Sequence, residues 1–289
     1  MAKKRQGQKP SACKDIVMVD NRWHLQGDRI DDVRVLERIE NMKLPPSWSN
    51  VAVSADPLAK VQAVGLDKAG RWQYRYSAEH IERAARKKFD RVKLFSRDMK
   101  KIRKGIKKGI KENDSRAYLL RLEDKTAIRA GSTTDFKAKK KAYGLTTLQN
   151  EHVRIKGNRI ILDFVAKEGI PAHYELTDEI LATWLKKRKE VTKAGEMLFP
   201  DVPATKLNLY LKKLAGGKSY TIKDFRTYHG TRIAFQELKQ FAGRVLSIKE
   251  KKELVKTVSS MASQFLKNTP VMAKKSYIDP MVWDFIGGI

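Results

Sequence analysis

Apolar residues recur at two different intervals along this chain of 289 residues, and the interval changes partway along. In residues 28–46 the apolar positions follow a helical interval that ends at Pro45, which predicts a short amphipathic helix. Residues 51–77 alternate apolar and polar positions and contain Gly65 and Gly70, a pattern typical of short antiparallel strands joined by tight turns. A small, mainly β module is therefore expected near the amino terminus.

Helical intervals return in residues 78–110, where lysine and arginine crowd the second half. We place the domain boundary in this stretch, at about residues 95–101, which gives an amino-terminal domain of residues 28–97 and a second domain of residues 98–289. The segment RKGIKKGIKEN, residues 103–113, is interpreted as a basic linker that would lie against a nucleic-acid backbone. A solvated helix face is the usual meaning of such a run, and that alternative stays open.

The second domain begins with a predicted helix from Ser115 that continues to Arg129 and breaks at the glycine and serine that follow. Strands are predicted in residues 152–176 with two hairpin turns, and Lys167 stands on the second turn. Helices fill most of the remaining chain. The expected fold class is α+β: a small, mainly β amino-terminal domain, then a larger, mainly α domain with a small β-sheet.

Charge indicates the partner, since 61 Lys and Arg residues oppose 33 Asp and Glu residues, for a formal net charge of +28. An excess of this size favours a polyanion, most simply nucleic acid. A membrane surface is the alternative, but we find no long apolar run, secretory signal or lipidation motif, and expect an intracellular protein associated with DNA. Residues 1–27 form a basic amino-terminal segment, and residues 1–10 are expected to be a disordered tail.

Metal chemistry has little support in the composition. Cys13 is the only cysteine, which excludes an internal disulfide and any zinc site made of several cysteines. The five histidines are scattered without metal-ligand spacing, so we expect no structural metal.

The run RWQYRY has the mixture of residues that a DNA-contacting strand needs. Arg71 and Arg75 suit phosphates, and Gln73 suits a base edge. Tyr74 and Tyr76 suit phosphate hydrogen bonds and apolar contact. Alternation along a strand puts Gln73 and Arg75 on one face and the aromatic residues on the other. The alternative is an aromatic face in the core and a charged face in water, and the pattern alone does not separate the two.

Tyr277 stands among basic residues in KNTPVMAKKSYIDP, just before a turn marked by proline. A phenol with a pKa of about 10 is a poor nucleophile at neutral pH, and its use as one requires nearby positive charge or hydrogen-bond donors at its target. Lys274 and Lys275 supply part of that charge. On this stretch alone, an aromatic residue packed under a short helix is the simpler interpretation.

Five residues along the chain can be considered together, in this order: Arg129, Lys167, Arg226, Asn268 and Tyr277. Their order and settings resemble the type IB DNA topoisomerases, especially the small poxvirus-type and bacterial enzymes. The resemblance covers nearly all of residues 28–286 and includes LPPSW, VQAVGLDKAGRWQYRY, IRAGS, FVAKEGI, KDFRTYHGTR and KKSYIDP. Each motif alone is weak, but the ordered set is specific.

The resemblance implies a two-domain clamp, with a catalytic fold shared with tyrosine recombinases, that surrounds double-stranded DNA and relaxes supercoils as a monomer without ATP, metal or other cofactor. Tyr277 would attack a phosphodiester and become joined to the 3′-phosphate while a 5′-hydroxyl departs. Arg129 and Arg226 would hold the non-bridging oxygens, and Lys167 would protonate the leaving oxygen with help from Arg129. Two guanidinium forks match the negative charge that gathers on the equatorial oxygens.

One position departs from the family pattern. The family usually carries histidine nine residues before the tyrosine, where this chain has Asn268. An amide donates a hydrogen bond to a phosphate oxygen but cannot be cationic, so slower chemistry is expected. His229 lies three residues after Arg226 on a helix that should turn it elsewhere, and we expect it to support a neighbouring residue instead.

Two alternatives stay open. A tyrosine recombinase uses a very similar set of residues on a related fold, but KDFR at the second arginine matches the topoisomerase form rather than the usual His-x-x-Arg. The amino-terminal LPPSW and QYRY motifs also have no counterpart in recombinases. A catalytically silent DNA-binding protein of the same fold would show the same charge, and only an assembled set of five residues separates it from an enzyme.

Overall fold

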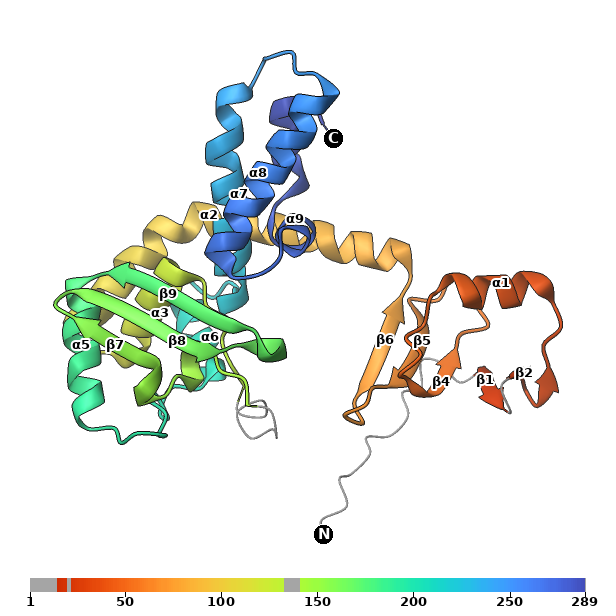
Figure 1. The fold of residues 1–289 in the computed structure, drawn as a ribbon, viewed down its shortest axis with the longest axis horizontal. Helices are drawn as coiled ribbons and strands as arrows, with labels where there is room; N and C mark the ends of the chain where they lie inside the picture. Colours follow the sequence, from red (N-terminus) through yellow and green to blue (C-terminus); the bar gives the residue numbers. More distant parts are fainter. Residues whose placement is uncertain (1–14, 20–21, 133–140, 289) are drawn as a thin grey trace, which may run out of the picture. The chain divides into compact units, whose positions relative to one another are not determined.

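The structure, a computed structural model, describes residues 15–19, 22–132 and 141–288 (Figure 1). The tail expected at residues 1–10 falls outside these ranges. Both helix and sheet are present, as the apolar pattern predicts, in an amino-terminal sheet unit and a mainly helical second unit.

The first unit contains a six-stranded antiparallel sheet in the order β3-β2-β1-β4-β5-β6. Its last three strands confirm the alternation seen in the sequence. The strands are β1 (Ile16–Val19), β2 (Arg22–Leu25), β3 (Asp28–Arg29), β4 (Ser49–Val53), β5 (Val61–Leu66) and β6 (Trp72–Tyr76).

Strands β1 and β2 lie within residues 1–27, where we expected only a basic segment. They join the sheet because Ile16 is buried opposite Val53 of β4. The predicted amino-terminal helix is present as α1 (Val33–Asn41), which begins where the Asp32 side chain accepts a hydrogen bond from the backbone of Arg34 at 2.9 Å. Its buried residue, Ile39, packs into the same apolar cluster as Ile16.

Helix α2 (Ala78–Lys111) is continuous, and the division between the units, after Lys88, falls inside it. The division comes earlier than the expected boundary at residues 95–101 because Val92 and Phe95 already belong to the core of the second unit. The interpretation of residues 103–113 as a linker is wrong, since most of this segment continues α2 and buries Ile106 among core residues.

The second unit combines a three-stranded antiparallel sheet with helices. The two predicted hairpins are confirmed, since β8 pairs with both β7 and β9. The strands are β7 (Val153–Lys156), β8 (Arg159–Val165) and β9 (Pro171–Thr177). The helices are α3 (Ser115–Thr126), α5 (Glu179–Glu190), α6 (Ala204–Leu214), α7 (Ile222–Leu238), α8 (Ile248–Leu266) and α9 (Pro270–Tyr277). Short 3-10 helices are η1 (Leu145–Thr147), η2 (Asn150–His152), η3 (Lys167–Gly169), η4 (Lys239–Phe241) and η5 (Pro280–Ile286).

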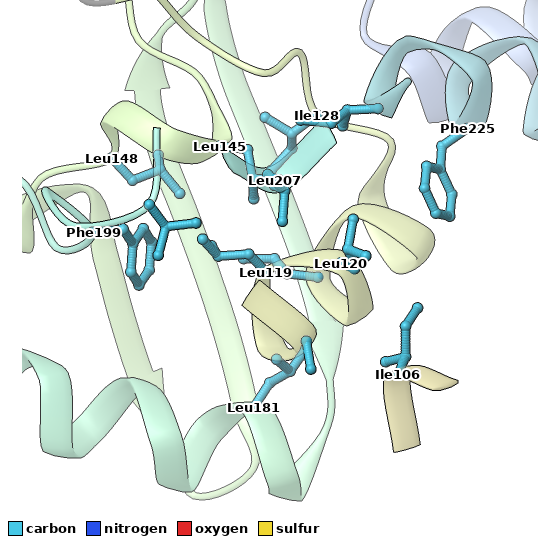
Figure 2. Packing of buried hydrophobic residues seen from close by; sticks show 14 of the residues in the cluster. Ile106, Leu119, Leu120, Ile128, Leu145, Leu148, Leu181, Phe199, Leu207 and Phe225 are labelled. Carbon is cyan, nitrogen blue, oxygen red and sulfur yellow. The ribbon is translucent and has the colours of Figure 1, made fainter. Parts of the chain in front are cut away.

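Helix α3 is the central element of this unit, because it contacts α5, α6, α7 and β9. Figure 2 shows Leu119 and Leu120 of α3 among apolar side chains from several other elements. Helices α7, α8 and α9 pack on one another and carry the carboxyl-terminal part of the chain (Figure 1). The unit therefore places the end of α3 next to helices that are far from it in the sequence.

Phe95 of α2 provides a test of this core. Its ring lies edge-on to those of Tyr220 and Phe225, each with centroids 5.0 Å away. We expect Phe95→Ala to lower the free energy of unfolding by about 3–5 kcal/mol, because it removes buried apolar area and leaves a cavity. Urea unfolding of the full chain measures this. Leu94→Ala is the matched control, since Leu94 is 45% exposed on the same helix, and equal losses in the two variants would contradict the assignment.

Candidate active site

The end of α3 sets the position of Arg129. The helix stops at Thr126 because Ala127 takes a left-handed backbone conformation, with φ of 48°, and its N–H donates to the carbonyl of Glu123 at 2.7 Å. The predicted continuation of the helix to Arg129 is therefore wrong. Arg129 lies on the segment that follows, where its carbonyl accepts a hydrogen bond from the backbone of Leu145 at 2.9 Å.

Arg226 projects from α7 into the interior and is only 2% exposed. Its guanidinium donates through Nη1 to the carbonyl of Ala127 and through Nη2 to the carbonyl of Leu266, the latter at 2.7 Å. These two carbonyls belong to the last turns of α3 and α8, so three helices fix one cation. Burying a charge is costly without such hydrogen bonds.

Tyr277 is the last residue of α9 and lies against Arg226. The helix begins at Pro270, after Thr269 accepts a hydrogen bond from the backbone of Met272 at 3.2 Å. Tyr277 is 9% exposed, and the centroid of its ring lies 4.9 Å from the central guanidinium carbon of Arg226. This is the distance of a cation–π contact.

The charge around Tyr277 favours its ionised form. Burial by itself raises the pKa of the phenol, but the positive charge of Arg226, with smaller contributions from Arg129 and Lys223, outweighs burial and places the pKa below its ordinary value of 10.0. A phenol with a lowered pKa is a better nucleophile near neutral pH. The basic neighbours with the largest effects on Tyr277 come from α7 and from the segment that follows α3.

The remaining two predicted catalytic residues are placed differently. Lys167 is exposed on the turn between β8 and β9 and makes no ion pair or hydrogen bond with a described residue. Asn268 lies just after the end of α8. Its side-chain oxygen and nitrogen are both buried without a hydrogen-bond partner in the described part of the chain. The structure thus gathers Arg129, Arg226 and Tyr277, and shows no contact of Lys167 with them.

Several neighbours of this site were not selected from the sequence. Tyr174 of β9 is buried and lies in the fields of Arg226 and Arg129, although burial is the larger effect and raises its pKa. Lys267 places its ammonium 5.7 Å from the centre of the Tyr174 ring, and both residues line a small recess with Arg129. Lys223 was visible only as part of the KDFR motif.

His229 belongs to a separate cluster. Its Nε2 lies 3.1 Å from Oδ1 of Asp124, and the other oxygen of this carboxylate, Oδ2, accepts a hydrogen bond from Nε of Arg103 at 2.7 Å. Burial raises the pKa of Asp124, but hydrogen bonds from His229 and Arg103 bring it to about 2. This agrees with the expected supporting role of His229, because its described hydrogen bond goes to Asp124.

The residues predicted to contact DNA in the first unit are engaged in different ways. Tyr74 and Tyr76 are 41% and 40% exposed, and their rings stack at 6.0 Å. Arg71 and Gln73 both donate to the Asp67 carboxylate at 2.9 Å. Arg75 donates to the carbonyl of Lys43 at 3.0 Å. Trp72 packs against the buried residues of the sheet, so the aromatic face is only partly core.

The described residues contain neither a metal-binding cluster nor a helix that could span a membrane. No group of three or more histidine, cysteine, aspartate or glutamate side chains is arranged to hold a metal ion there. Among those same ranges, no helix combines the length and apolar character needed to cross a bilayer.

A buried tyrosine beneath an arginine held by three helices is a site suited to phosphoryl transfer. Residues 77–281 match the family model described as "Eukaryotic DNA topoisomerase I, catalytic core", and residues 23–67 match "Bacterial DNA topoisomerase IB, N-terminal domain". The chain therefore belongs to the type IB DNA topoisomerases, and the resemblance noted from its motifs is confirmed.

Viral proteins are among its relatives. DNA topoisomerase 1B of Acanthamoeba polyphaga mimivirus is 28% identical over 267 residues, which cover 84% of this chain and 77% of the relative. DNA topoisomerase 1B of Vaccinia virus (strain Copenhagen) is 27% identical over 272 residues, 89% of this chain and 83% of the relative. DNA topoisomerase 1 of Rabbit fibroma virus (strain Kasza) is 25% identical over 265 residues, 86% of this chain and 81% of the relative.

The contact between α7 and α9 gives a prediction about stability. A Cβ added to Gly230 would lie 2.5 Å from the carbonyl oxygen of Tyr277. We expect Gly230→Ala to lower the free energy of unfolding by about 1–3 kcal/mol, because α9 must move to accommodate the methyl group. Chemical denaturation measures the loss. Gln236→Ala, on the exposed face of α7, should change stability by less than about 0.5 kcal/mol, and a neutral Gly230→Ala would refute the close packing.

Proposed function

We propose that this chain relaxes supercoiled double-stranded DNA by cutting one strand with Tyr277 and then resealing it. The observation that supports this most is the Tyr277 ring held 4.9 Å from the Arg226 guanidinium carbon, in a chain of the type IB family. The Tyr277 phenol loses its proton to solvent, and the resulting phenolate oxygen attacks the scissile phosphorus and forms a 3′-phosphotyrosine bond. The bond from phosphorus to the 5′-oxygen breaks, and the departing oxygen takes a proton from Lys167, assisted by Arg129.

In this proposal the two arginines neutralise the charge that develops on the non-bridging phosphate oxygens. Arg226 is fixed before DNA arrives, since its carbonyl partners hold it in place. A donor that is already positioned stabilises a transition state without further reorganisation. Because the energy of the broken bond is kept in the phosphotyrosine, the reaction needs neither ATP nor another cofactor.

Lys167 carries the general acid role in this proposal and must approach the leaving oxygen when DNA is bound. Its exposure on the turn between β8 and β9 leaves it without a competing partner among the described residues. An ammonium placed near phosphates and partly desolvated can pass its proton to a departing alkoxide.

We also propose that the amino-terminal domain, predicted as residues 28–97, and the catalytic domain, predicted as residues 98–289, close around DNA as a clamp. Tyr74 and Tyr76 are already exposed for contact. The other contacts predicted for this strand, Arg71, Gln73 and Arg75, would exchange their present oxygen partners for DNA. The enzyme would act as a monomer on DNA inside a cell, with the charge of +28 supplying phosphate attraction.

The two alternatives are separable by experiment. A tyrosine recombinase would join two DNA segments rather than relax one plasmid. A catalytically silent DNA-binding protein would bind DNA and do neither. The deciding experiment is plasmid relaxation in EDTA without ATP, followed by a search for protein joined covalently to DNA.

Tyr277→Phe is the first test of the site. We expect it to abolish relaxation and the covalent adduct while leaving duplex affinity nearly intact, because only the attacking oxygen is lost and the cationic surface remains. Plasmid relaxation, adduct trapping and a DNA-binding titration measure the three properties. Tyr118→Phe is the matched control, since its hydroxyl donates to the carbonyl of Ile110. Relaxation by Tyr277→Phe near the rate of the parent would end the assignment.

Lys167→Ala tests the general acid. We expect this variant to cleave an ordinary phosphodiester slowly, and to be largely rescued on a substrate with sulfur at the 5′-bridging position, because a thiolate departs without a proton. Single-turnover cleavage of the two substrates measures the rescue. Lys156→Ala, on the other hairpin of the sheet, is the control. An equal defect on both substrates would make Lys167 a binding residue.

The last prediction concerns Asn268, where this chain departs from the family pattern. Asn268→Ala should slow cleavage by about tenfold, the value of one hydrogen bond made mainly in the transition state, and scarcely change DNA affinity. Asn268→His should retain or raise activity. Because imidazole gains a proton as pH falls toward about 6.5, any gain should grow in that direction. Single-turnover cleavage of a suicide duplex from about pH 5.5 to 8 measures both effects. If Asn268→Ala cleaves as fast as the parent at every pH, Asn268 is only a spacer.

A further inference from the structure

Glu123, in the last turn of α3, is an acidic residue that the proposed reaction does not use. Its side chain is completely buried, with 0% exposure, and neither carboxyl oxygen has a hydrogen-bond partner in the described ranges. Buried polar groups without partners are rare in proteins and call for a physical reason. An ionised carboxylate left in this state would cost several kcal/mol or more, so it would normally take up a proton.

The charges around Glu123 agree with an uncharged carboxyl group. Burial raises its pKa well above the ordinary 4.5, the positive charge of Arg226 acts in the opposite direction, and the neighbouring Asp124 raises the pKa further. Glu123 also interacts electrostatically with Tyr174 of β9, and Arg129 in turn acts on Tyr174. A bound DNA phosphate would add negative charge and favour the protonated form still more.

Glu123 is tied to Arg226 through the end of α3. The backbone carbonyl of Glu123 accepts a hydrogen bond from the Ala127 N–H at 2.7 Å, which closes the last turn of α3. The carbonyl of Ala127 in turn accepts a hydrogen bond from Nη1 of Arg226. The Nε of Arg226 is itself buried without a partner among described residues. A carboxyl group and an arginine N–H that both lack hydrogen-bond partners in the described part of the chain are thus linked through the end of α3, and the charge of Arg226 acts on Glu123.

The charge state of this neighbour matters for the reaction. A carboxylate beside Arg226 would cancel part of the charge that lowers the pKa of Tyr277, and it would repel the scissile phosphate. An uncharged carboxylic acid fills the same volume and can hydrogen-bond, but it leaves the guanidinium charge for Tyr277 and DNA.

We propose that Glu123 is a positioning residue, whose buried, uncharged side chain keeps the end of α3, and with it the Ala127 carbonyl that holds the Arg226 guanidinium, in place without cancelling the charge of Arg226. This inference rests on the proposed function, since it assigns Glu123 a part in the same reaction. Glu123 acts through Arg226 and does not touch the DNA.

Single-turnover cleavage of a suicide duplex tests the idea with Glu123→Gln and Glu123→Ala. Glutamine keeps the size of the side chain and is always uncharged, so its cleavage rate should stay within about threefold of the parent, with a parallel profile across about pH 6 to 8. Alanine leaves a void under the end of α3 and should slow cleavage by at least about tenfold, with DNA affinity little changed. Glu112→Gln and Glu112→Ala are matched controls at an exposed glutamate.

A double-mutant cycle shows whether the effect passes through Arg226. In an Arg226→Lys background, Glu123→Ala should cost less than about twofold, because the group that it positions is already altered. Infrared spectra of the DNA-free proteins give a readout that does not depend on activity: the parent should show a protonated carboxyl band that Glu123→Gln lacks.

The outcomes are distinct. A Glu123→Gln variant as slow as Glu123→Ala, a missing infrared band, or a full loss in the Arg226→Lys background would each overturn the inference. If the parent itself formed no covalent adduct with DNA, the proposed function would fail instead. Should Glu123→Ala not fold, Glu123→Gln and the infrared band still decide the question.

Discussion

The second unit depends on one buried cation, Arg226, and on how its charge is accommodated. A guanidinium at 2% exposure is tolerated only because two main-chain carbonyls accept its hydrogen bonds. Those carbonyls, of Ala127 and Leu266, are free to do so because each stands at or next to a helix end, where carbonyls lack partners within the helix. The carboxyl-terminal ends of α3 and α8 therefore both provide hydrogen-bond acceptors for the Arg226 guanidinium.

This arrangement links local backbone geometry to chemistry. Ala127 and Lys267 both take left-handed conformations, with φ of 48° and 50°, and each ends a helix beside Arg226. A non-glycine residue in this region of the Ramachandran plot costs free energy, so the surrounding packing must hold it there. Residues assigned to the proposed reaction follow both turns: Arg129 is two residues after Ala127, and Asn268 is the residue after Lys267. The two left-handed residues thus position both the carbonyls that hold Arg226 and the polar residues that follow them in the chain.

The site is organised by excess positive charge rather than by balanced ion pairs. Arg226 contacts two carbonyl dipoles and an aromatic ring, and no described carboxylate forms a salt bridge with it. Asp124, the next residue along α3, is by contrast paired with Arg103 and His229 and keeps its negative charge. Two adjacent acidic residues on one helix therefore meet opposite environments, and only the paired one is fit to remain ionised. A site with unneutralised cations is suited to a phosphate that brings its own charge.

The sequence by itself determined most of the element types and the family, and it proposed the chemical residues, because these depend on local periodicity and on short motifs in a fixed order. The alternation in residues 51–77 and the two hairpin turns after His152 predicted their strands correctly. Only the tertiary structure decided which segments that are distant in the sequence contact one another. The basic composition of residues 103–111 favours a solvated segment. These residues nevertheless belong to α2, because Ile106 packs among core residues that are distant in the sequence. No sequence pattern marks Glu123, for the same reason. Its proposed role depends on Arg226, which is distant in the sequence and acts on Glu123 only because α3 and α7 pack together.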